Sequence, residues 1–330
     1  MLSEFSLIQK YFTRTTPGAV LGVGDDAALV RVGSGMELAI STDMLVNGTH
    51  FFPDADPFML GHKALAVNIS DMAAMGAQPR WATLAIALPA EDEAWLARFS
   101  AGFFALADDF KVELIGGDTT QGPLNLSVTI LGEVPQGQAL RRDGAQMGDE
   151  IWVSGKLGDA ALALAHMQGR LKLDEAGFAA TAAALHRPLP RVALGIALRG
   201  IAHSAIDISD GLLADLGHIL ERSGMAAELQ FDKLPMSIYL RSYFEQSTGF
   251  EQSTALEQST ARQCVLAGGD DYELCFTAPV ERHAQLEKIS AQLELPLSCI
   301  GQIVAGSGCR VYAADGREIT TKETGYDHFA

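Results

Sequence analysis

The sequence predicts an α/β protein of two domains, and three observations support this. The chain has 330 residues, more than a single hydrophobic core usually serves. Strand-like apolar runs alternate with helical periodicity in both halves. Between the halves, the stretch PQGQALRRDGAQMGDE is rich in Gly, Gln and charge, as linkers are. We therefore expect an α+β domain over residues 1–138 and an α/β domain over residues 139–330.

The N-terminal half contains three stretches typical of helices and three typical of strands. In SEFSLIQKYF, Phe5, Ile8 and Phe12 share one helical stripe. Apolar periodicity predicts two further helices, over residues 57–76 and 91–110. Runs rich in β-branched and apolar residues predict strands over residues 37–42, 81–88 and 124–134.

The C-terminal half repeats the alternation. We expect a helix over residues 157–168 and another over 211–222. Predicted strands cover residues 150–154, 273–277 and 297–304, and a shorter one ends at Asp207. EQST occurs three times within residues 245–260, and we interpret this repeat as a surface loop or helix extension.

Charge and composition exclude several classes of partner. Acidic residues outnumber basic ones by 41 to 24, so a nucleic acid or an anionic membrane is not an expected partner. No apolar run reaches the roughly 18 residues of a membrane span, and the N-terminal stretch lacks the pattern of a signal peptide. The four cysteines show no CxxC spacing. We therefore expect reduced thiols and a cytoplasmic location.

Aspartates recur at the ends of apolar segments or inside them. Such positions are unusual for solvated carboxylates, which need a partner when buried. Lysine and arginine are scarce nearby, so divalent cations are the expected counter-charges, and Mg²⁺ prefers oxygen ligands. The motifs are GVGDDAALV, STDMLVNGTHF, NISDMAAMGA, LIGGDTTQG, AIDISDGLLADL and LAGGDDYELCF.

Each acid also has a simpler explanation, and these alternatives stay open. Asp25 and Asp26 could fill a turn, and Asp43 could cap one. Asp71 could lie on an exposed helix face, and Asp210 could be a plain helix N-cap. We interpret Asp215, inside the predicted helix over residues 211–222, as an ordinary helical acid.

Two further types of residue are candidates for phosphate binding. The glycine pairs of GGDTT and GGDDYE could present backbone N–H groups to phosphate, or could simply form tight turns. Arg142 could bind a phosphate or be an ordinary surface arginine. His50 could contact the substrate or have a structural role. GVGDDA formally fits a dinucleotide-binding fingerprint, but its two aspartates would repel a pyrophosphate, and no Walker A sequence occurs.

Taken together, the motifs resemble those of the thiamine-monophosphate kinase family. The order GVGDDAA, STDMLVNGTHF, NISDMAAMGA, LIGGDTT, LRRDGA, DISDGL, GGDDYEL and GYDHF is similar over nearly the whole chain. That family belongs to a superfamily with aminoimidazole ribonucleotide synthetase, selenophosphate synthetase and the hydrogenase maturation protein HypE. The resemblance implies a PurM-like two-domain fold, ATP-dependent phosphorylation of thiamine monophosphate to thiamine diphosphate, and a homodimer formed through the sheet of the N-terminal domain.

The resemblance also implies a role for each matching position. Implied magnesium ligands are Asp26, Ser41, Thr42, Asp43, Asp71, Asp118, Asp207 and Asp210. Implied ATP contacts are Gly117, Asp118, Arg142 and Ser209. Implied contacts with thiamine monophosphate are His50, Asp270 and Tyr326. Asp270 stands where relatives often have Glu, and Phe103 or Phe104 would have to supply an aromatic ATP contact that Ala101 cannot.

The residues also suit this chemistry directly. The acceptor is a phosphate monoester that is already anionic at neutral pH, so we expect no general base. Metal ions would offset the repulsion between the two phosphate groups. A ring-closing synthetase of the same superfamily and a non-enzymatic ligand sensor remain the alternatives. Selenophosphate synthetase fits poorly, because the chain lacks an N-terminal Cys followed by Lys.

Overall fold

A computed structural model describes residues 3–249, 255–320 and 325–326, and side chains are described outside 245–259. The chain forms two compact units. Unit 1 comprises Met1–Met72 and Ala77–Ala139, and unit 2 comprises Ala73–Gly76 and Leu140–Ala330.

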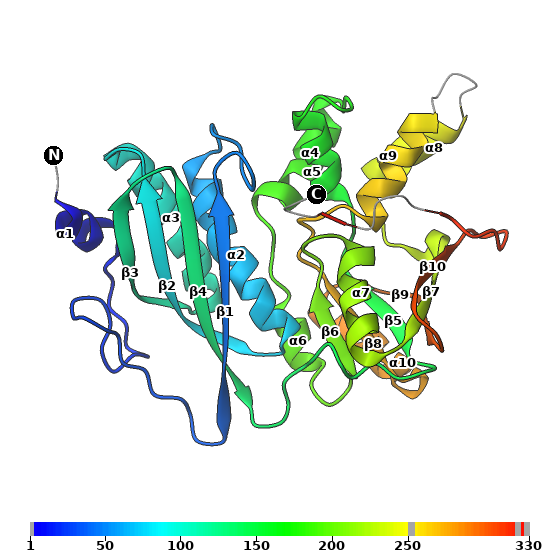
Figure 1. Cartoon of the computed structure of the whole chain (residues 1–330), viewed down its shortest axis with the longest axis horizontal. Helices are drawn as coiled ribbons and strands as arrows, with labels where there is room; N and C mark the ends of the chain where they lie inside the picture. The colour runs from blue at the N-terminus through cyan, green and yellow to red at the C-terminus, as the bar shows by residue number, and fades with distance from the viewer. Residues whose placement is uncertain (1–2, 250–254, 321–324, 327–330) are drawn as a thin grey trace. The chain divides into compact units, whose positions relative to one another are not determined.

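Unit 1 is built on a four-stranded sheet in the order β1-β4-β2-β3 (Figure 1). Strands β1 and β2 each pair antiparallel with β4, whereas β2 and β3 run parallel. Side chains alternate along β4, where Leu126, Val128 and Ile130 are buried and their neighbours are only partly covered. The strands are β1 (Met36–Val46), β2 (Gln78–Leu88), β3 (Glu113–Gln121) and β4 (Asn125–Pro135).

Two long helices, α2 (Pro57–Ala74) and α3 (Glu93–Phe110), cover one face of this sheet and leave the other without helices (Figure 1). Asp92 caps α3, since its carboxylate accepts the N–H groups of Ala94 and Trp95. Before the sheet, a short helix α1 (Glu4–Leu7) continues as a π-helical turn η1 (Ile8–Phe12). The stripe predicted there is partly wrong, because Phe12 is buried but Phe5 is exposed.

Glycines allow the two long helices of unit 1 to approach closely. A Cβ on Gly61 of α2 would clash with the carbonyl oxygen of Phe99. A Cβ on Gly102 of α3 would clash with the carbonyl oxygen of Phe58. Each helix therefore presents a glycine where the backbone of the other one passes.

Unit 2 contains a six-stranded mixed sheet in the order β10-β7-β9-β5-β8-β6. Only β10 and β7 run parallel, and the other neighbouring pairs are antiparallel. The strands are β5 (Glu150–Ser154), β6 (Ser204–Asp207), β7 (Ala226–Gln230), β8 (Leu274–Ala278), β9 (Leu297–Val304) and β10 (Gly308–Tyr312).

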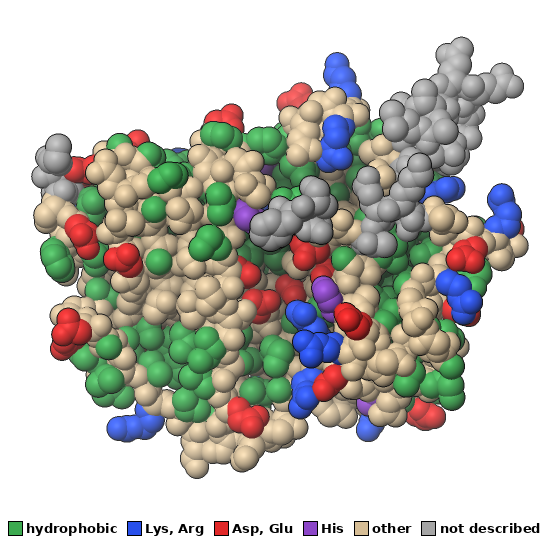
Figure 2. Space-filling view, in the orientation of Figure 1, with side chains coloured by type: hydrophobic (Ala, Val, Ile, Leu, Met, Phe, Trp, Pro, Cys, Tyr) green, Lys and Arg blue, Asp and Glu red, His purple; other side chains and the backbone are tan. Residues whose placement is uncertain are grey.

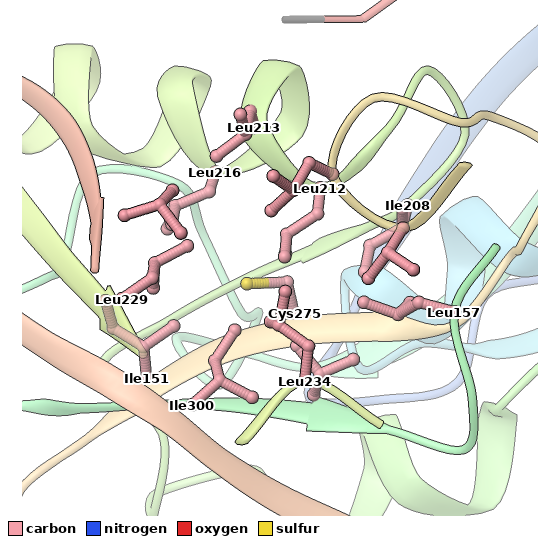
Figure 3. Close-up of a cluster of buried hydrophobic side chains, with 14 of the residues drawn as sticks. Ile151, Leu157, Ile208, Leu212, Leu213, Leu216, Leu229, Leu234, Cys275 and Ile300 are labelled. Carbon is pink, nitrogen blue, oxygen red and sulfur yellow. The ribbon is translucent and has the colours of Figure 1, made fainter. Parts of the chain in front are cut away.

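The core of unit 2 lies between the sheet and helix α7 (Leu212–Ser223). Leu212 and Leu216 point from α7 toward Cys275 of β8, and Leu229 and Ile300 line the same cluster (Figure 3). The other helices are α4 (Asp159–Met167), α5 (Glu175–His186), α6 (Val192–Ala197), α8 (Ile238–Gly249), α9 (Ala255–Leu266) and α10 (His283–Leu293), with 3₁₀ turns η2 (Phe231–Lys233) and η3 (Val280–Arg282).

Every element predicted from the sequence has a counterpart in the structure, but several elements were missed. Strand β1 extends four residues beyond the predicted end at 42, and β3 was not predicted. Part of the EQST repeat lies outside the described residues, and the remainder belongs to α8 and α9. Within the described ranges, no helix is both long and apolar enough to cross a membrane.

Candidate functional site

In unit 1, strand β1 and helix α2 bring three of the predicted magnesium ligands together. Ser41 and Asp43 alternate with exposed residues along β1, so both side chains face the helices. The Ser41 hydroxyl donates to Oδ2 of Asp71 on α2 at 2.5 Å. The backbone N–H of Asp43 donates to Oδ1 of Asn68 on α2 at 3.1 Å. Ser41, Asp43 and Asp71 therefore form one half-buried group of oxygen donors.

Asn68 is a positioning residue that the sequence reasoning missed. It is 1% exposed, and its amide also donates to the Ala64 carbonyl at 3.0 Å. The Asn68 side chain therefore binds the backbone of an edge strand at the position of Asp43. The sequence did indicate Asn68, because in the motif NISD this polar residue lies three positions before Asp71, almost one helical turn.

Two other predicted ligands of unit 1 lie on the helix-free face of the sheet. Thr42 is exposed, and its hydroxyl lies 2.8 Å from that of Thr129 on β4. Asp118 is exposed and pairs in register with Ala85, which is also exposed, whereas the next residue Thr119 is buried. The structure therefore does not group the side chains of Thr42 and Asp118 with those of Ser41, Asp43 and Asp71.

Gly117, a predicted ATP contact, lies inside β3 rather than in a turn after a strand. Its φ of +154° and its closeness to the Leu84 backbone leave no space for a Cβ. The turn interpretation of GGDTT is therefore wrong. Asp118 therefore directly follows a position whose backbone conformation only glycine can adopt.

The acidic pair Asp25–Asp26 lies in an exposed turn between short bridges. The N–H of Asp26 donates to Oδ1 of Asp25 at 2.9 Å. Asp25 therefore stabilises the turn itself, which was the alternative to metal binding. Asp26 itself is exposed. His50, half-buried, accepts the N–H of Val46 on Nδ1 at 3.0 Å, which places the proton of the neutral ring on Nε2.

In unit 2, the loop between β6 and α7 carries three predicted ligands and contacts. Asp207, 4% exposed, ends β6, and Ser209 and Asp210 follow half-buried. The interpretation of Asp210 as a helix N-cap is wrong, because Gly211 occupies the N-cap position of α7. The carboxylate that binds this turn belongs to Asp215.

Asp215 is not the ordinary helical acid that we expected. Its Oδ2 accepts the backbone N–H groups of Ser209, Asp210 and Gly211 at 3.0, 3.0 and 3.1 Å. Burial, and next the negative charge of Asp210, raise the pKa of Asp215 to about 7, although the three hydrogen bonds lower it. The sequence held a signal, since Asp215 falls on the apolar stripe formed by Leu212, Leu216 and Ile219.

The GGDDYE segment and the C-terminal motif meet the same loop. The N–H of Asp270 donates to the Ser209 carbonyl at 2.8 Å, and the N–H of Tyr326 donates to the Asp210 carbonyl at 3.0 Å. Asp270 has a φ of +69°, a strained conformation for a residue other than glycine. Unit 2 therefore brings Ser209, Asp210, Asp270 and Tyr326 together, although they are far apart in the sequence.

Two acids, the half-buried Asp271 and the buried Glu273, anchor the segment that carries Asp270. Asp271 accepts the N–H of Gly158 at 2.9 Å, and burial raises its pKa well above the ordinary range. Glu273 is 5% exposed and forms a two-pronged ion pair with Arg191, whose Nε lies 2.7 Å from Oε2. It also accepts the Ser154 hydroxyl at 2.5 Å. Sequence reasoning missed this network, because Arg191 is 82 residues from Glu273.

The remaining predicted contacts differ in exposure. Arg142 is exposed, and its carbonyl accepts the Ser223 hydroxyl at 3.0 Å, which anchors its backbone. Phe103 is 0% exposed and Phe104 5%, and the Arg14 guanidinium lies 3.7 Å from the centre of the Phe104 ring. Both rings are core residues, so neither offers a face for stacking on a nucleotide.

Known proteins resemble this chain over nearly its whole length. Residues 24–134 match the model described as "AIR synthase related protein, N-terminal domain", and residues 146–314 match the corresponding C-terminal domain. The thiamine-monophosphate kinase of Escherichia coli is 47% identical over 331 residues, covering 99% of this chain and 98% of the relative.

Two solved structures are similar throughout their length. Thiamine-monophosphate kinase from Stenotrophomonas maltophilia has a TM-score of 0.81 at 48% identity, covering 92% of this chain and 93% of that one. AaThiL complexed with AMPPCP and TMP has a TM-score of 0.75 at 31% identity, covering 98% and 96%. The fold is therefore the two-domain PurM-like α/β architecture that the motifs imply, and the chain belongs to the thiamine-monophosphate kinase family.

Proposed function

We propose that this chain transfers the γ-phosphoryl group of ATP to thiamine monophosphate, giving thiamine diphosphate and ADP as the last step of thiamine diphosphate synthesis. The observation that carries the proposal is the full-length relationship to thiamine-monophosphate kinases, one of which was solved with AMPPCP and TMP. Both reactants carry anionic phosphate groups, and most candidate site residues are carboxylates, so metal cations would be needed between the two.

Magnesium is the metal that the candidate ligands fit. Ser41, Asp43 and Asp71 offer hard oxygen donors in a half-buried group, and Asp207 and Asp210 offer two more carboxylates. Mg²⁺ keeps several waters and binds substrate phosphate, so it requires only a few protein ligands. When bound, magnesium would neutralise phosphate charge. Asp26, Thr42 and Asp118 remain proposed ligands as well.

The protein's own residues would mainly bind and orient the reactants. We infer ATP contacts at Gly117, Asp118, Arg142 and Ser209. The positive charge of Arg142 would offset phosphate charge. The acceptor phosphate is itself the nucleophile, so no side chain is needed to remove a proton, and we assign no catalytic base.

For thiamine monophosphate we infer contacts at His50, Asp270 and Tyr326. Tyr326 is 52% exposed beside Asp210, so its ring can stack on a thiamine ring. His50 carries the proton of its neutral ring on Nε2 and can donate it to a phosphate oxygen. Asp270 is held by the backbone of Ser209.

We also propose a homodimer formed through the helix-free face of the unit 1 sheet. On β1, Ile40 is 60% exposed and Met44 56% exposed, and Figure 2 shows hydrophobic side chains at the surface over this sheet. A second copy of the chain could cover this face by pairing it with its own. The cytoplasmic location remains a prediction.

The decisive experiment is product analysis. Purified chain is mixed with MgATP and thiamine monophosphate, and the products are separated by chromatography. Equal amounts of thiamine diphosphate and ADP, abolished by EDTA, would support the kinase. Release of orthophosphate without thiamine diphosphate would indicate a ring-closing synthetase. Binding of both ligands without ATP consumption would indicate a sensor.

A further inference from the structure

Asp215 makes an unusual set of contacts for a side chain inside a helix. One oxygen atom, Oδ2, accepts three consecutive backbone N–H groups, from Ser209, Asp210 and Gly211, at 3.0 to 3.1 Å. Asp215 is 3% exposed, so water cannot replace these bonds. Gly211, at the N-cap position of α7, has no side chain with which to cap the helix.

The loop that Asp215 binds is short and closely packed. Ile208 and Leu212 flank it and both point into the core of unit 2 (Figure 3). Gly211 has a φ of +123°, and a Cβ there would clash with the Ala267 backbone. With both ends anchored in the core, the three N–H groups between them define the path of the loop.

Backbone carbonyls of this loop in turn hold two residues of the proposed substrate site. The Ser209 carbonyl accepts the N–H of Asp270, and the Asp210 carbonyl accepts the N–H of Tyr326. Asp215 would act on those two residues through the loop that its carboxylate holds. The same loop carries the side chains of Ser209 and Asp210, which are proposed for ATP and metal.

We propose that Asp215 is a positioning residue for phosphoryl transfer: it holds the Ser209–Gly211 turn so that the nucleotide-side residues Ser209 and Asp210 and the acceptor-side residues Asp270 and Tyr326 keep their relative geometry. This inference rests on the proposed kinase function. It assigns to Asp215 a role that requires no contact with either substrate.

The test compares Asp215→Ala and Asp215→Asn with a matched control, Asp149→Ala. Asp149 is also 3% exposed, also lies in unit 2 and accepts the N–H of Gln146, but it pairs with His203 away from this loop. All variants are assayed at a temperature where circular dichroism shows them folded. Asp215→Ala should raise the KM for both ATP and thiamine monophosphate by about 10-fold or more, since three N–H groups lose their acceptor.

Asp215→Asn keeps an oxygen that can accept the N–H groups, so it should restore most of the lost affinity. Asp149→Ala should lower the melting temperature with both KM values within about 2-fold of wild type. Hydrogen exchange over residues 208–213 supplies a readout independent of activity: these amides should exchange faster in Asp215→Ala and remain protected in Asp149→Ala.

Several outcomes would overturn the inference. Unchanged KM values in folded Asp215→Ala would do so, and so would an equal rise in Asp149→Ala, which would indicate general destabilisation. Unchanged protection of residues 208–213 in Asp215→Ala would show that other contacts hold the loop. A wild-type chain that makes no thiamine diphosphate would refute the proposed function first, and the inference with it.

Discussion

At the scale of single residues, the clearest consequence of burial is the titration of Asp215. Its pKa is about 7 in the folded chain, against an ordinary 3.8. Because the folded state binds this proton more tightly, the contribution to stability is fully present below pH 4 and is lost as pH rises through 7. We predict that metal-free protein gains about 3 kcal/mol from Asp215 between pH 8 and pH 5.

Urea unfolding at the two pH values measures this gain. Asp271 and Asp159 also have raised pKa values, so the wild-type gain alone does not isolate Asp215. The contribution of Asp215 is the part of the gain that Asp215→Asn removes. An equal gain in wild type and Asp215→Asn would contradict the prediction.

The group of oxygen donors in unit 1 gives a second prediction at this scale. Asp43→Asn and Asp71→Asn should each lower kcat by about 100-fold or more at fixed magnesium, because an amide is a poor ligand for Mg²⁺. The folded structure should persist, since both residues are only half-buried. Asp54→Asn, an exposed change outside the motifs, is the control for the steady-state assay. Activity near wild type in both Asp43→Asn and Asp71→Asn would contradict the metal assignment.

The sequence revealed those site residues whose role shows in the residues next to them along the chain. Asp71 and Asp207 stand out because a carboxylate interrupts an apolar run. The ion pair of Arg191 with Glu273 has no such signal, since its partners meet only in the folded chain. Asp215 was misjudged because helical acids are common and its acceptor role depends on a turn that bends back onto the helix.

At the scale of elements, the packing of α2 on α3 depends on two glycines. A methyl group on Gly102 would meet the Phe58 carbonyl, which belongs to helix backbone and cannot move aside alone. We predict that Gly102→Ala destabilises the chain by about 1 to 3 kcal/mol in chemical denaturation.

Gly217 of α7 is the control for this substitution. No atom lies within 4 Å of a Cβ placed there, so Gly217→Ala should stabilise the chain by about 0.5 to 1 kcal/mol. The same substitution is thus expected to have opposite signs in two helices. A stabilised Gly102→Ala would show that α2 and α3 do not cross as described.

The elements missed by sequence reasoning have physical explanations. Strand β3 includes Gly116, Gly117 and Asp118, all residue types that disfavour strands, and its parallel pairing with β2 overrides them. β1 continues through Asp43 because it pairs with β4 as far as Val46. At residues 116–118 and at Asp43, the local composition favours a turn. Pairing with the neighbouring strand makes both segments part of the sheet instead.

At the scale of the whole molecule, the proposed homodimer predicts that charges introduced at its interface halve the mass of the particle in solution. Ile40→Glu combined with Met44→Glu places two charges on the helix-free face and should convert dimer to monomer in light scattering. Phe5→Glu is the control, because Phe5 is 79% exposed but lies on α1, outside the sheet. A wild-type monomer, or a dimer unaffected by both β1 charges, would contradict the proposed interface.

The division of the chain into units does not follow a single cut in the sequence. Unit 2 includes Ala73–Gly76, although these residues precede more than sixty residues of unit 1. Within unit 2, the Gly76 carbonyl accepts Nε of Arg199 at 2.6 Å, and the Met75 carbonyl accepts the N–H of Leu140 at 3.0 Å. Gly195 has no space for a Cβ beside the Ala73 carbonyl.

This interleaving limits how the protein can be recombined. A chimera that joins the first 139 residues of one relative to the remainder of another would separate Arg199 and Gly195 from residues 73–76, which they contact in this structure. Such a hybrid inherits a foreign segment in the middle of unit 2. Crossover sites for chimeras or fragment complementation therefore need to carry residues 73–76 together with the C-terminal half.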